Sequence, residues 1–313
     1  MNSLLFPGQG SQLVGMGSEF FKNFNIVKEI FNQADETLKF SISKIILEGP
    51  DEKLSLTENT QPAILTVSYS IFKVLKDEFS FDINLFKYFA GHSLGEYSAL
   101  VCSGSINFND ALYLLNERGK AMQEAVPLGR GIMIAILGAK TKEVIELIAS
   151  LKEKKGVCEI ANDNAEGQVI VSGNVDDVKI LQSNLKEKKI KTIPLKVSAP
   201  FHCKLMKPAA EKMEDKIKNI QFNMPNYEII SNVTALPEKD PKVIKKLLID
   251  QIFSTVRWRE SMIHIANKGV KNFVEIGPGK ALSGMVKRTI KNSNCFSINS
   301  IGDIQNLNDK FKK

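Results

Sequence analysis

The sequence GHSLG at positions 91 to 95 places one serine, Ser93, where it could act as a nucleophile. A short apolar segment, Tyr88 to Ala90, precedes it and a run typical of a helix follows, so the serine is expected on a sharp strand-to-helix turn. Such a turn exposes the hydroxyl at a helix N-terminus, whose free N–H groups stabilise developing negative charge. We therefore interpret Ser93 as a nucleophile for a carbonyl carbon and not as an ordinary turn serine.

A serine hydroxyl needs a general base, and the chain contains three histidines. His92 lies inside the same turn, where it is expected to point away from Ser93 and to serve backbone packing. His264 falls on an apolar helical stretch and is interpreted as a partly buried structural residue. His202 ends the sequence PFH at 200 to 202, just after the last strand of the middle segment, and it is the predicted base.

An arginine interrupts the apolar face of a helix that begins near Ala111. Arg118 lies seven residues later, on the stripe that includes Met122, so its guanidinium is expected to be buried. A desolvated guanidinium needs an anion, and its planar fork suits a carboxylate. That carboxylate comes either from elsewhere in the fold or, as we favour, from the substrate. Gln251 is a second polar residue on an apolar stripe, seven residues after Ile244.

The loop PGQGSQ at 7 to 12 lies between an expected strand, Leu4 to Phe6, and an expected helix. A dinucleotide-binding loop would need a third glycine at position 13, where the chain has Leu13. The glycine-flanked N–H of Gln9 is instead expected to point into the same cleft as Ser93, as a donor to an oxyanion.

Two patterns of elements would position these residues. The first part of the chain alternates apolar strands with helices, one of which carries Phe20, Phe24 and Phe31 at helical spacing, and this predicts an α/β domain. The middle segment predicts the order βαββαβ of a ferredoxin-like domain: strands at 132–137, 157–161, 168–171 and 191–197, and helices at 142–151 and 175–185, the second capped by Asn174. We therefore expect a discontinuous large domain, 1–126 and 199–313, an inserted small domain, 127–198, and a cleft at their junction.

Composition excludes several other classes of protein. Of the 313 residues, 43% are hydrophobic and 25% are charged, as in an average globular chain, and no apolar run reaches the roughly 18 residues that span a bilayer. The four cysteines match neither a metal knuckle nor a secreted disulfide scaffold. We expect a monomeric, cytoplasmic protein with reduced thiols, no targeting segment, no metal and no membrane contact.

Charge is distributed unevenly along the chain. The 42 Lys and Arg residues and 35 Asp and Glu residues give a net charge of +7, but residues 1–126 carry −5 and residues 127–313 carry +12. The lysines alternate with acids and lack interleaved aromatic residues, so nucleic acid is not the expected partner. The basic half is either a solvated face or a surface that attracts an acidic protein.

Seven segments, taken together and in order, resemble the malonyl-CoA:acyl carrier protein transacylases of type II fatty acid synthesis. They are PGQGSQ at 7–12, TQPA at 60–63, GHSLGE at 91–96, RGKAM at 118–122, PFH at 200–202, SNVTA at 231–235 and EIGPG at 275–279. The resemblance implies an α/β-hydrolase-like large domain with the ferredoxin-like insert, and a Ser/His dyad in place of a triad. The chain departs from the family at Glu166, where a proline is usual.

The resemblance also implies a role for single residues. Ser93 matches the acylated serine, His202 the base, and Arg118 the arginine that grips the malonyl carboxylate. The other matching positions support these three: backbone N–H groups of Gln9 and Leu94 as the oxyanion hole, the main-chain carbonyl of Gln251 as the group that orients the histidine, and Met122 and Phe201 at the substrate. Related malonyl-selective domains also carry Phe at the position before the histidine, and methylmalonyl-selective ones carry the smaller Ser.

The implied reaction moves a malonyl group from malonyl-CoA to the phosphopantetheine thiol of acyl carrier protein, an acidic and transient partner, and needs no bound cofactor or metal. Three other functions stay open at this point. A serine esterase or thioesterase would share the elbow and the histidine, but would have no use for a buried Arg118. A related acyltransferase would load another acyl group for polyketide assembly, and a silent module would only bind carrier protein.

Overall fold

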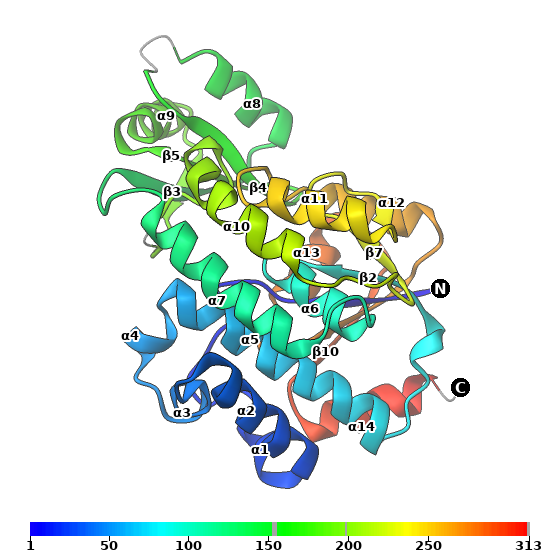
Figure 1. Ribbon diagram of the computed structural model, residues 1–313. Helices are drawn as coiled ribbons and strands as arrows, with labels where there is room; N and C mark the ends of the chain where they lie inside the picture. Colours follow the sequence, from blue (N-terminus) through cyan, green and yellow to red (C-terminus); the bar gives the residue numbers. More distant parts are fainter. Residues whose placement is uncertain (152–154, 198, 312–313) are drawn as a thin grey trace.

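The computed structural model describes residues 1–151, 155–197 and 199–311, which form two β-sheets flanked by helices (Figure 1). The larger sheet has the strand order β10-β9-β1-β2-β7-β8, and all its pairings are parallel except that of β7 with β8. Its strands are β1 (Asn2–Phe6), β2 (Phe86–Gly91), β7 (Glu228–Ile230), β8 (Pro237–Glu238), β9 (Asn272–Ile276) and β10 (Asn294–Ile298). The central strands are buried on both faces, as parallel strands covered by helices are.

The smaller sheet is antiparallel and has the order β4-β5-β3-β6. Its elements follow one another as strand, helix, strand, strand, helix, strand, as predicted: β3 (Gly131–Leu137), α8 (Thr141–Ala149), β4 (Cys158–Ala165), β5 (Gln168–Asn174), α9 (Val175–Glu187) and β6 (Lys191–Pro194). In Figure 1 this sheet lies at the top of the molecule, above the large sheet. Ser198, at the predicted domain boundary, lies outside the described residues.

Three local predictions in these segments are wrong in detail. The first strand of the hairpin continues to Ala165, because the polar residues after Ala161 still pair with β5. The last strand ends at Pro194 and not at 197, because its pairing with β3 ends there, with a final hydrogen bond from Leu195 N to Met133 O at 3.0 Å. Asn174 does precede α9, but its side chain makes no cap and accepts a hydrogen bond from Val157 N at 2.7 Å instead.

The remaining helices lie around the large sheet, some in contact with its strands and others packed on neighbouring helices. They are α1 (Ser18–Asn23), α2 (Asn25–Leu38), α3 (Ile42–Glu48), α4 (Asp51–Leu54), α5 (Thr57–Lys73), α6 (Gly95–Cys102), α7 (Phe108–Glu124), α10 (Lys207–Asn219), α11 (Pro241–Gln251), α12 (Trp258–Asn267), α13 (Ala281–Thr289) and α14 (Ile301–Phe311), with short helical turns at Val74–Glu78, Ile83–Leu85 and Lys204–Met206. The helix predicted through Phe20 and Phe31 is two helices, because the extended backbone of Phe24 separates α1 from α2. No helix in the described ranges has both the length and the apolar character needed to cross a membrane.

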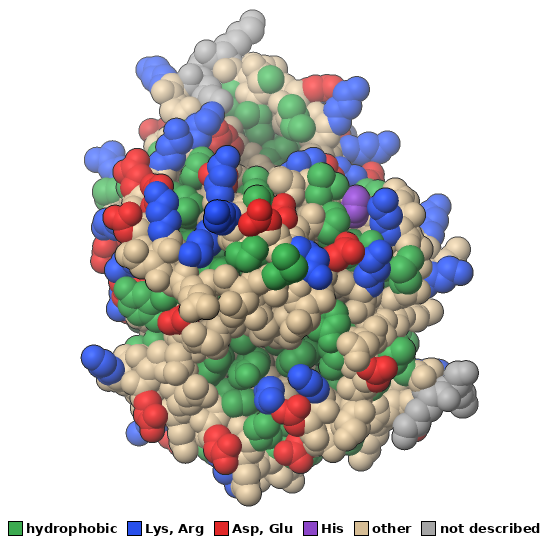
Figure 2. Space-filling model, turned by 45° about the vertical axis from the view of Figure 1, so that its right-hand side comes forward, with side chains coloured by type: hydrophobic (Ala, Val, Ile, Leu, Met, Phe, Trp, Pro, Cys, Tyr) green, Lys and Arg blue, Asp and Glu red, His purple; other side chains and the backbone are tan. Residues whose placement is uncertain are grey.

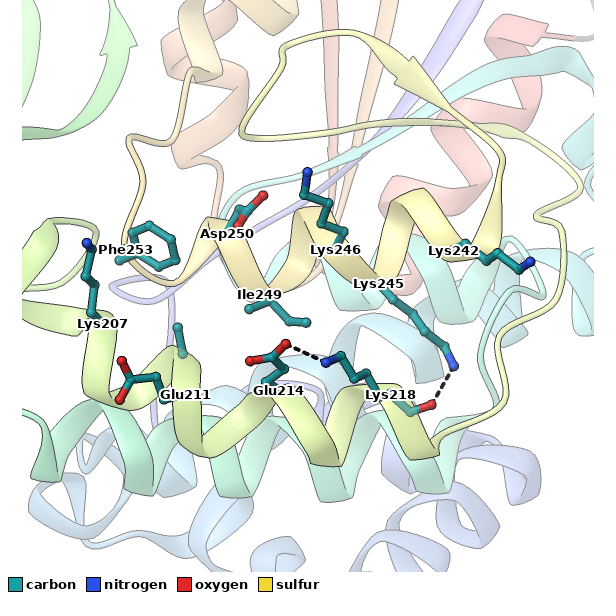
Figure 3. Close-up of a pocket in the computed structure, with 11 residues that line it drawn as sticks. Lys207, Glu211, Glu214, Lys218, Lys242, Lys245, Lys246, Ile249, Asp250 and Phe253 are labelled. Atoms are coloured by element: carbon teal, nitrogen blue, oxygen red, sulfur yellow. Dashed lines mark hydrogen bonds and ion pairs between the residues drawn. The ribbon is translucent and has the colours of Figure 1, made fainter.

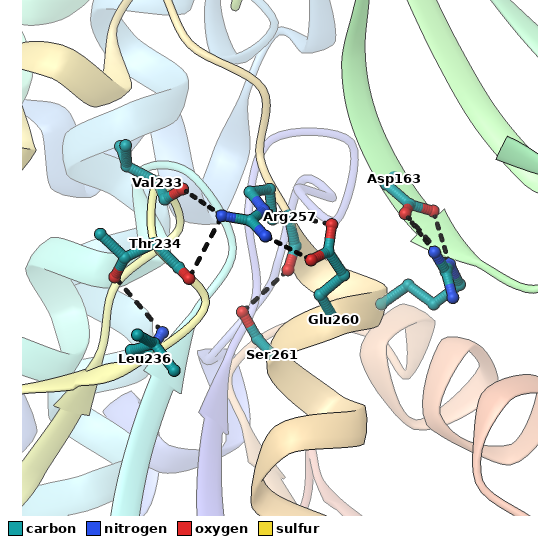
Figure 4. A network of polar contacts seen from close by, with 8 residues as sticks. Asp163, Val233, Thr234, Leu236, Arg257, Glu260 and Ser261 are labelled. Atoms are coloured by element: carbon teal, nitrogen blue, oxygen red, sulfur yellow. Dashed lines mark hydrogen bonds and ion pairs between the residues drawn. The ribbon is translucent and has the colours of Figure 1, made fainter. Parts of the chain in front are cut away.

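A seam of hydrogen bonds joins the small sheet to the large one. The segment before α12 runs beside β4, where Asp163 N donates to Val256 O at 3.0 Å and Val256 N donates to Ala161 O at 2.8 Å. The buried carboxylate of Asp163 also pairs with Arg259 of α12 at 2.9 Å (Figure 4). These contacts fix β4 over the end of β2, where the candidate site lies.

Candidate active site

Ser93 lies on a tight turn between β2 and α6, as predicted, and its backbone is in the left-handed region with φ of 53°. The two flanking glycines are required by close approach. A Cβ on Gly91 would lie 1.9 Å from the carbonyl of Gly95, and a Cβ on Gly95 would lie 2.2 Å from the oxygen of Phe6. Any side chain at either position would therefore force the turn apart.

Asn232, in the loop after β7, holds this turn from the side. Its Oδ1 accepts a hydrogen bond from Ser93 N at 2.7 Å and its Nδ2 donates to Gly91 O at 2.7 Å. The loop is held in turn by Arg257, whose guanidinium donates to the carbonyl oxygens of Val233 and Thr234 (Figure 4). Asn232 has no role predicted from the sequence, where its only signal is its place in the segment SNVTA.

His202 is the histidine that reaches the serine. Its Nε2 lies 2.8 Å from Ser93 Oγ, and its Nδ1 lies 2.9 Å from the main-chain oxygen of Gln251. A carbonyl only accepts, so Nδ1 carries the proton and the neutral ring presents a bare Nε2 to the hydroxyl. Burial, followed by the nearby charge of Arg118, lowers the pKa of His202 to about 3, so the ring is neutral at physiological pH.

Arg118 is buried, as its place on an apolar face predicts, with 1% of its surface exposed. Its Nη1 donates to Gln61 Oε1 at 2.7 Å, and its Nη2 donates to Gln251 Oε1 at 2.8 Å and to Ser93 Oγ at 3.1 Å. Its Nε has no partner among the described residues. The described chain therefore offers this guanidinium only neutral oxygens as direct partners, and burial lowers its pKa.

The two glutamates of α7, Glu117 and Glu124, form ion pairs with lysines and not with Arg118. Glu117 pairs with Lys120 and Lys216, and Glu124 pairs with Lys212. Gln61, which does bind Arg118, belongs to the segment TQPA, and the sequence analysis gave it no role. Its partner on α7 is 57 residues away in the chain, so no local pattern could have connected them.

The side chains of the candidate site line a common cavity of about 480 Å³. Ser93, His202 and Arg118 open into it, and it is also lined by Gln9, Met122 and Phe201, which the sequence analysis placed there. The backbone N–H groups of Gln9 and of Leu94, the residue after the serine, have no hydrogen-bond partner within the described ranges. An oxygen bound beside Ser93 could accept from them.

The other two histidines have different partners from His202. His92 Nε2 is 2.8 Å from Asn164 Oδ1 on β4, so the side chain joins the turn to the small sheet, a wider role than the predicted backbone packing. His264 is half-buried on α12, as predicted. Neither has a described contact with Ser93 Oγ, which leaves His202 as its histidine partner.

The chain is similar to proteins of known class over almost its whole length. The profile of the family described as "Acyl transferase domain" matches residues 4–313. A protein of Bacillus subtilis named malonyl CoA-acyl carrier protein transacylase is 43% identical over 288 residues, which cover 91% of this chain and 89% of that protein.

Solved structures agree with this similarity. An acyl-carrier-protein-S-malonyltransferase from Bartonella henselae superposes with a TM-score of 0.96 at 38% identity and covers 100% of this chain and 99% of its own. A malonyl-transacylase in complex with a type II PKS acyl-carrier protein superposes with a TM-score of 0.95 at 35% identity, covering 99% of each chain.

Proposed function

Because the chain belongs to the acyl transferase domain family, we propose that it transfers a malonyl group from malonyl-CoA to acyl carrier protein, for fatty acid synthesis, through a malonyl ester of Ser93. One observation carries the choice of acyl group. A buried guanidinium without a direct carboxylate partner among the described residues lies 3.1 Å from the serine oxygen, where the carboxylate of a malonyl group would arrive.

In the first half-reaction, Ser93 Oγ attacks the malonyl thioester carbon while its proton moves to His202 Nε2. The carbonyl oxygen becomes an oxyanion held by the N–H groups of Gln9 and Leu94. The C–S bond then breaks, and the histidine returns its proton to the CoA thiolate. The main-chain oxygen of Gln251 holds the ring in the required tautomer throughout.

In the second half-reaction, the pantetheine thiol of acyl carrier protein takes the place of CoA. His202 accepts the thiol proton, the sulfur attacks the ester carbon, and Ser93 leaves with the proton that His202 returns. The two half-reactions are mirror images, so one base in one cavity serves both. Side chains and backbone groups of this chain carry out both half-reactions, and malonyl-CoA is the substrate of the first.

The proposal includes the shape of the acyl pocket. Met122, four residues after Arg118, and Phe201, directly before His202, both line the cavity, and Phe201 is 6% exposed. The aromatic ring would occupy the space that an α-methyl branch needs. Malonyl is therefore the proposed acyl group, in preference to methylmalonyl or acetyl.

Two further assignments support this function. We take the large sheet with residues 1–126 and 199–313 as an α/β-hydrolase-like domain, since the serine turn follows a parallel strand. We take 127–198 as a ferredoxin-like insert, since its four strands have the chain order and sheet order of that fold. Apart from these two assignments, a cytoplasmic location fits Cys102, Cys203 and Cys295, which are free thiols.

A lysine-lined groove suggests where carrier protein docks. Between α10 and α11 lies a groove of about 590 Å³ with a floor of Ala210, Ile249 and Phe253 (Figure 3). Five lysines line it, against three acids: Lys207, Lys218, Lys242, Lys245 and Lys246. Figure 2 shows basic side chains gathered over the upper half of that face, mixed with acidic ones.

The groove is continuous with the catalytic histidine. A neighbouring cavity of about 760 Å³ is lined by His202 and shares Lys207 and Phe253 with the groove. An acidic helix of carrier protein laid along the groove would pair with Lys242 and Lys246, which have no ion pair among the described residues. We therefore assign the groove to the carrier protein, the transient partner of the second half-reaction.

Radiolabel transfer tests the function directly. The purified protein is incubated with labelled malonyl-CoA, and label is expected on Ser93 within a single turnover, followed by its release on addition of holo acyl carrier protein. Release by water at the same rate would indicate a thioesterase, and no label on the serine would indicate a binding module. Carrier proteins of fatty acid and polyketide systems, compared as acceptors, separate those two pathways.

A further inference from the structure

A buried carboxylate lies directly behind the site. Glu96 is in the first turn of α6, three residues after Ser93, and only 2% of its surface is exposed. Its Oε2 accepts a hydrogen bond from Gln251 Nε2 at 2.7 Å and another from Asn232 N at 3.1 Å. Its carboxylate has no described bond to the nucleophile or the base, so the reaction above leaves this group without a function.

The contacts of Gln251 fix the orientation of its side-chain amide. Its Nε2 faces three acceptors: the carboxylate of Glu96 at 2.7 Å, the main-chain oxygen of Ser93 at 3.1 Å and, more distantly, Asn232 Oδ1 at 3.5 Å. Its Oε1 faces Nη2 of Arg118 at 2.8 Å. A guanidinium only donates, and an ionised carboxylate only accepts. The amide therefore has one satisfactory orientation, and hydrogen bonds run in one direction from Arg118 through Gln251 to Glu96.

The same glutamine also orients the base, because its main-chain oxygen accepts from His202 Nδ1 at 2.9 Å. We propose that Glu96 is a positioning residue that acts through Gln251 on both Arg118 and His202, and thereby sets the preference for a substrate with a carboxylate. This inference rests on the proposed malonyl transfer. In this role Glu96 contributes to the recognition of the acyl group without any contact with that group.

The surroundings of Glu96 make its charge state sensitive to pH. Arg118 on α7 is the cation that faces it, and the other titratable groups nearby are Tyr97 on α6 and the neutral His202. Asn232 and Gln251, from the loop after β7 and from α11, are uncharged donors. Burial raises the pKa of Glu96 to about 7, against the lowering effect of its hydrogen bonds and of Arg118.

The first test replaces the carboxylate by an amide of the same size. In Glu96→Gln the new side chain could donate to Gln251 Oε1, which would turn the NH₂ of that glutamine toward Arg118 and set donor against donor. We expect kcat/KM for malonyl-CoA to fall about tenfold and that for acetyl-CoA to fall by no more than about threefold. Acylation of Ser93 by each labelled acyl-CoA measures the ratio.

A matched control is available elsewhere in the chain. Glu275 on β9 is also fully buried, and its oxygens accept from the N–H groups of Leu282 and Ser283 at the start of α13. It does not line the cavity. Glu275→Gln is expected to lower thermal stability without changing the ratio of malonyl to acetyl transfer, so the pair of variants separates positioning from general loss of a buried carboxylate.

The second test begins with the wild-type protein, so it gives a decisive result even if Glu96→Gln fails to fold. Above a pH of about 7 Glu96 is ionised and accepts from Gln251, and below it the proton weakens that acceptor. In the wild-type protein the malonyl to acetyl ratio is therefore expected to rise about three- to tenfold between pH 6 and 8. The rise should persist in Glu275→Gln and vanish in Glu96→Gln.

The outcomes separate this proposal from the one on which it rests. A wild-type protein that transfers no malonyl group would overturn the proposed function itself. A wild-type protein that transfers malonyl with a ratio independent of pH, or a folded Glu96→Gln with the wild-type ratio, would overturn only the role of Glu96.

Discussion

Replacing Arg118 by alanine tests the physical reason for the malonyl assignment. The guanidinium is 1% exposed and binds three neutral oxygens, on Gln61, Gln251 and Ser93. With acetyl-CoA these partners remain the only ones, but a malonyl carboxylate would add a charged acceptor. Truncation therefore removes an interaction that only the dicarboxylic substrate makes.

The expected loss of activity in Arg118→Ala follows from the strength of the hydrogen bonds that the guanidinium would make to the malonyl carboxylate. A hydrogen bond to a charged group contributes about 1.5–3 kcal/mol, and the two existing amide partners of Arg118 already satisfy part of its demand. We take about 1.5–3 kcal/mol as the net gain from the carboxylate as a whole. At about 1.4 kcal/mol per factor of ten, kcat/KM for malonyl-CoA should fall roughly 10- to 150-fold in Arg118→Ala. The value for acetyl-CoA should change by no more than about threefold.

The assay measures acylation of Ser93 by labelled malonyl- and acetyl-CoA in the wild type, Arg118→Ala and Arg118→Lys. The lysine keeps a cation but not the planar fork, so it should fall between the other two. Thermal unfolding of each variant shows whether the site is intact. An equal proportional loss of malonyl and acetyl transfer in Arg118→Ala would refute the reasoning, because the arginine would then be structural.

The remaining predictions concern the nucleophile, the base, the acyl pocket and docking. Ser93→Ala should abolish covalent malonyl label while the melting temperature stays within a few degrees, and retained label would contradict the nucleophile. His202→Ala should slow acylation and release alike by roughly 10² to 10⁴ fold, whereas loss in only one half-reaction would require a second base. Phe201→Ser should raise kcat/KM for methylmalonyl-CoA relative to malonyl-CoA by roughly 10-fold or more, and an unchanged ratio would exclude steric selection by the ring. Raising ionic strength from about 0.05 to 0.3 M shortens the Debye length from about 14 to 6 Å and should raise the KM for carrier protein far more than that for malonyl-CoA. The double variant Lys242→Glu and Lys246→Glu should also raise the KM for carrier protein. A control pair of exposed lysines outside the groove, Lys22→Glu on α1 with Lys44→Glu on α3, should leave that KM unchanged. Equal effects of the two double variants would make the groove only a solvated face.

Features of the candidate site could be predicted from the sequence where they depend on residues that are close together in the chain. The turn at Ser93 could be predicted because its glycines, its strand and its helix are adjacent in the chain, and the local geometry demands all of them. Arg118 could be predicted as buried because helical spacing places it among apolar residues. The order of elements in the small sheet followed from periodicity alone, although strand ends did not, since they depend on pairing partners.

The supporting network could not be predicted from the sequence, because its members come from distant segments. Asn232 meets Ser93 across 139 positions, Glu96 meets Gln251 across 155, and Gln61 meets Arg118 across 57. Each residue by itself is an ordinary polar side chain. Only the fold brings Gln61 on α5, Glu96 on α6, Arg118 on α7 and Gln251 on α11 within hydrogen-bond distance of one another.

The group that orients His202 is the uncharged main-chain oxygen of Gln251, and an uncharged group suits a site that also contains Arg118. A carboxylate at the position of the Gln251 carbonyl would orient the ring equally well, but it would also raise the pKa of the histidine. It would add a second anion beside the guanidinium, which would compete with the carboxylate of the substrate. A main-chain oxygen orients Nδ1 at 2.9 Å without bringing charge, and the side chain of the same residue offers Arg118 only an amide oxygen at 2.8 Å. In the proposed function, a dyad oriented by a carbonyl therefore leaves the cation available for an anionic acyl group, while the carboxylate of Glu96 reaches Arg118 only through the side chain of Gln251.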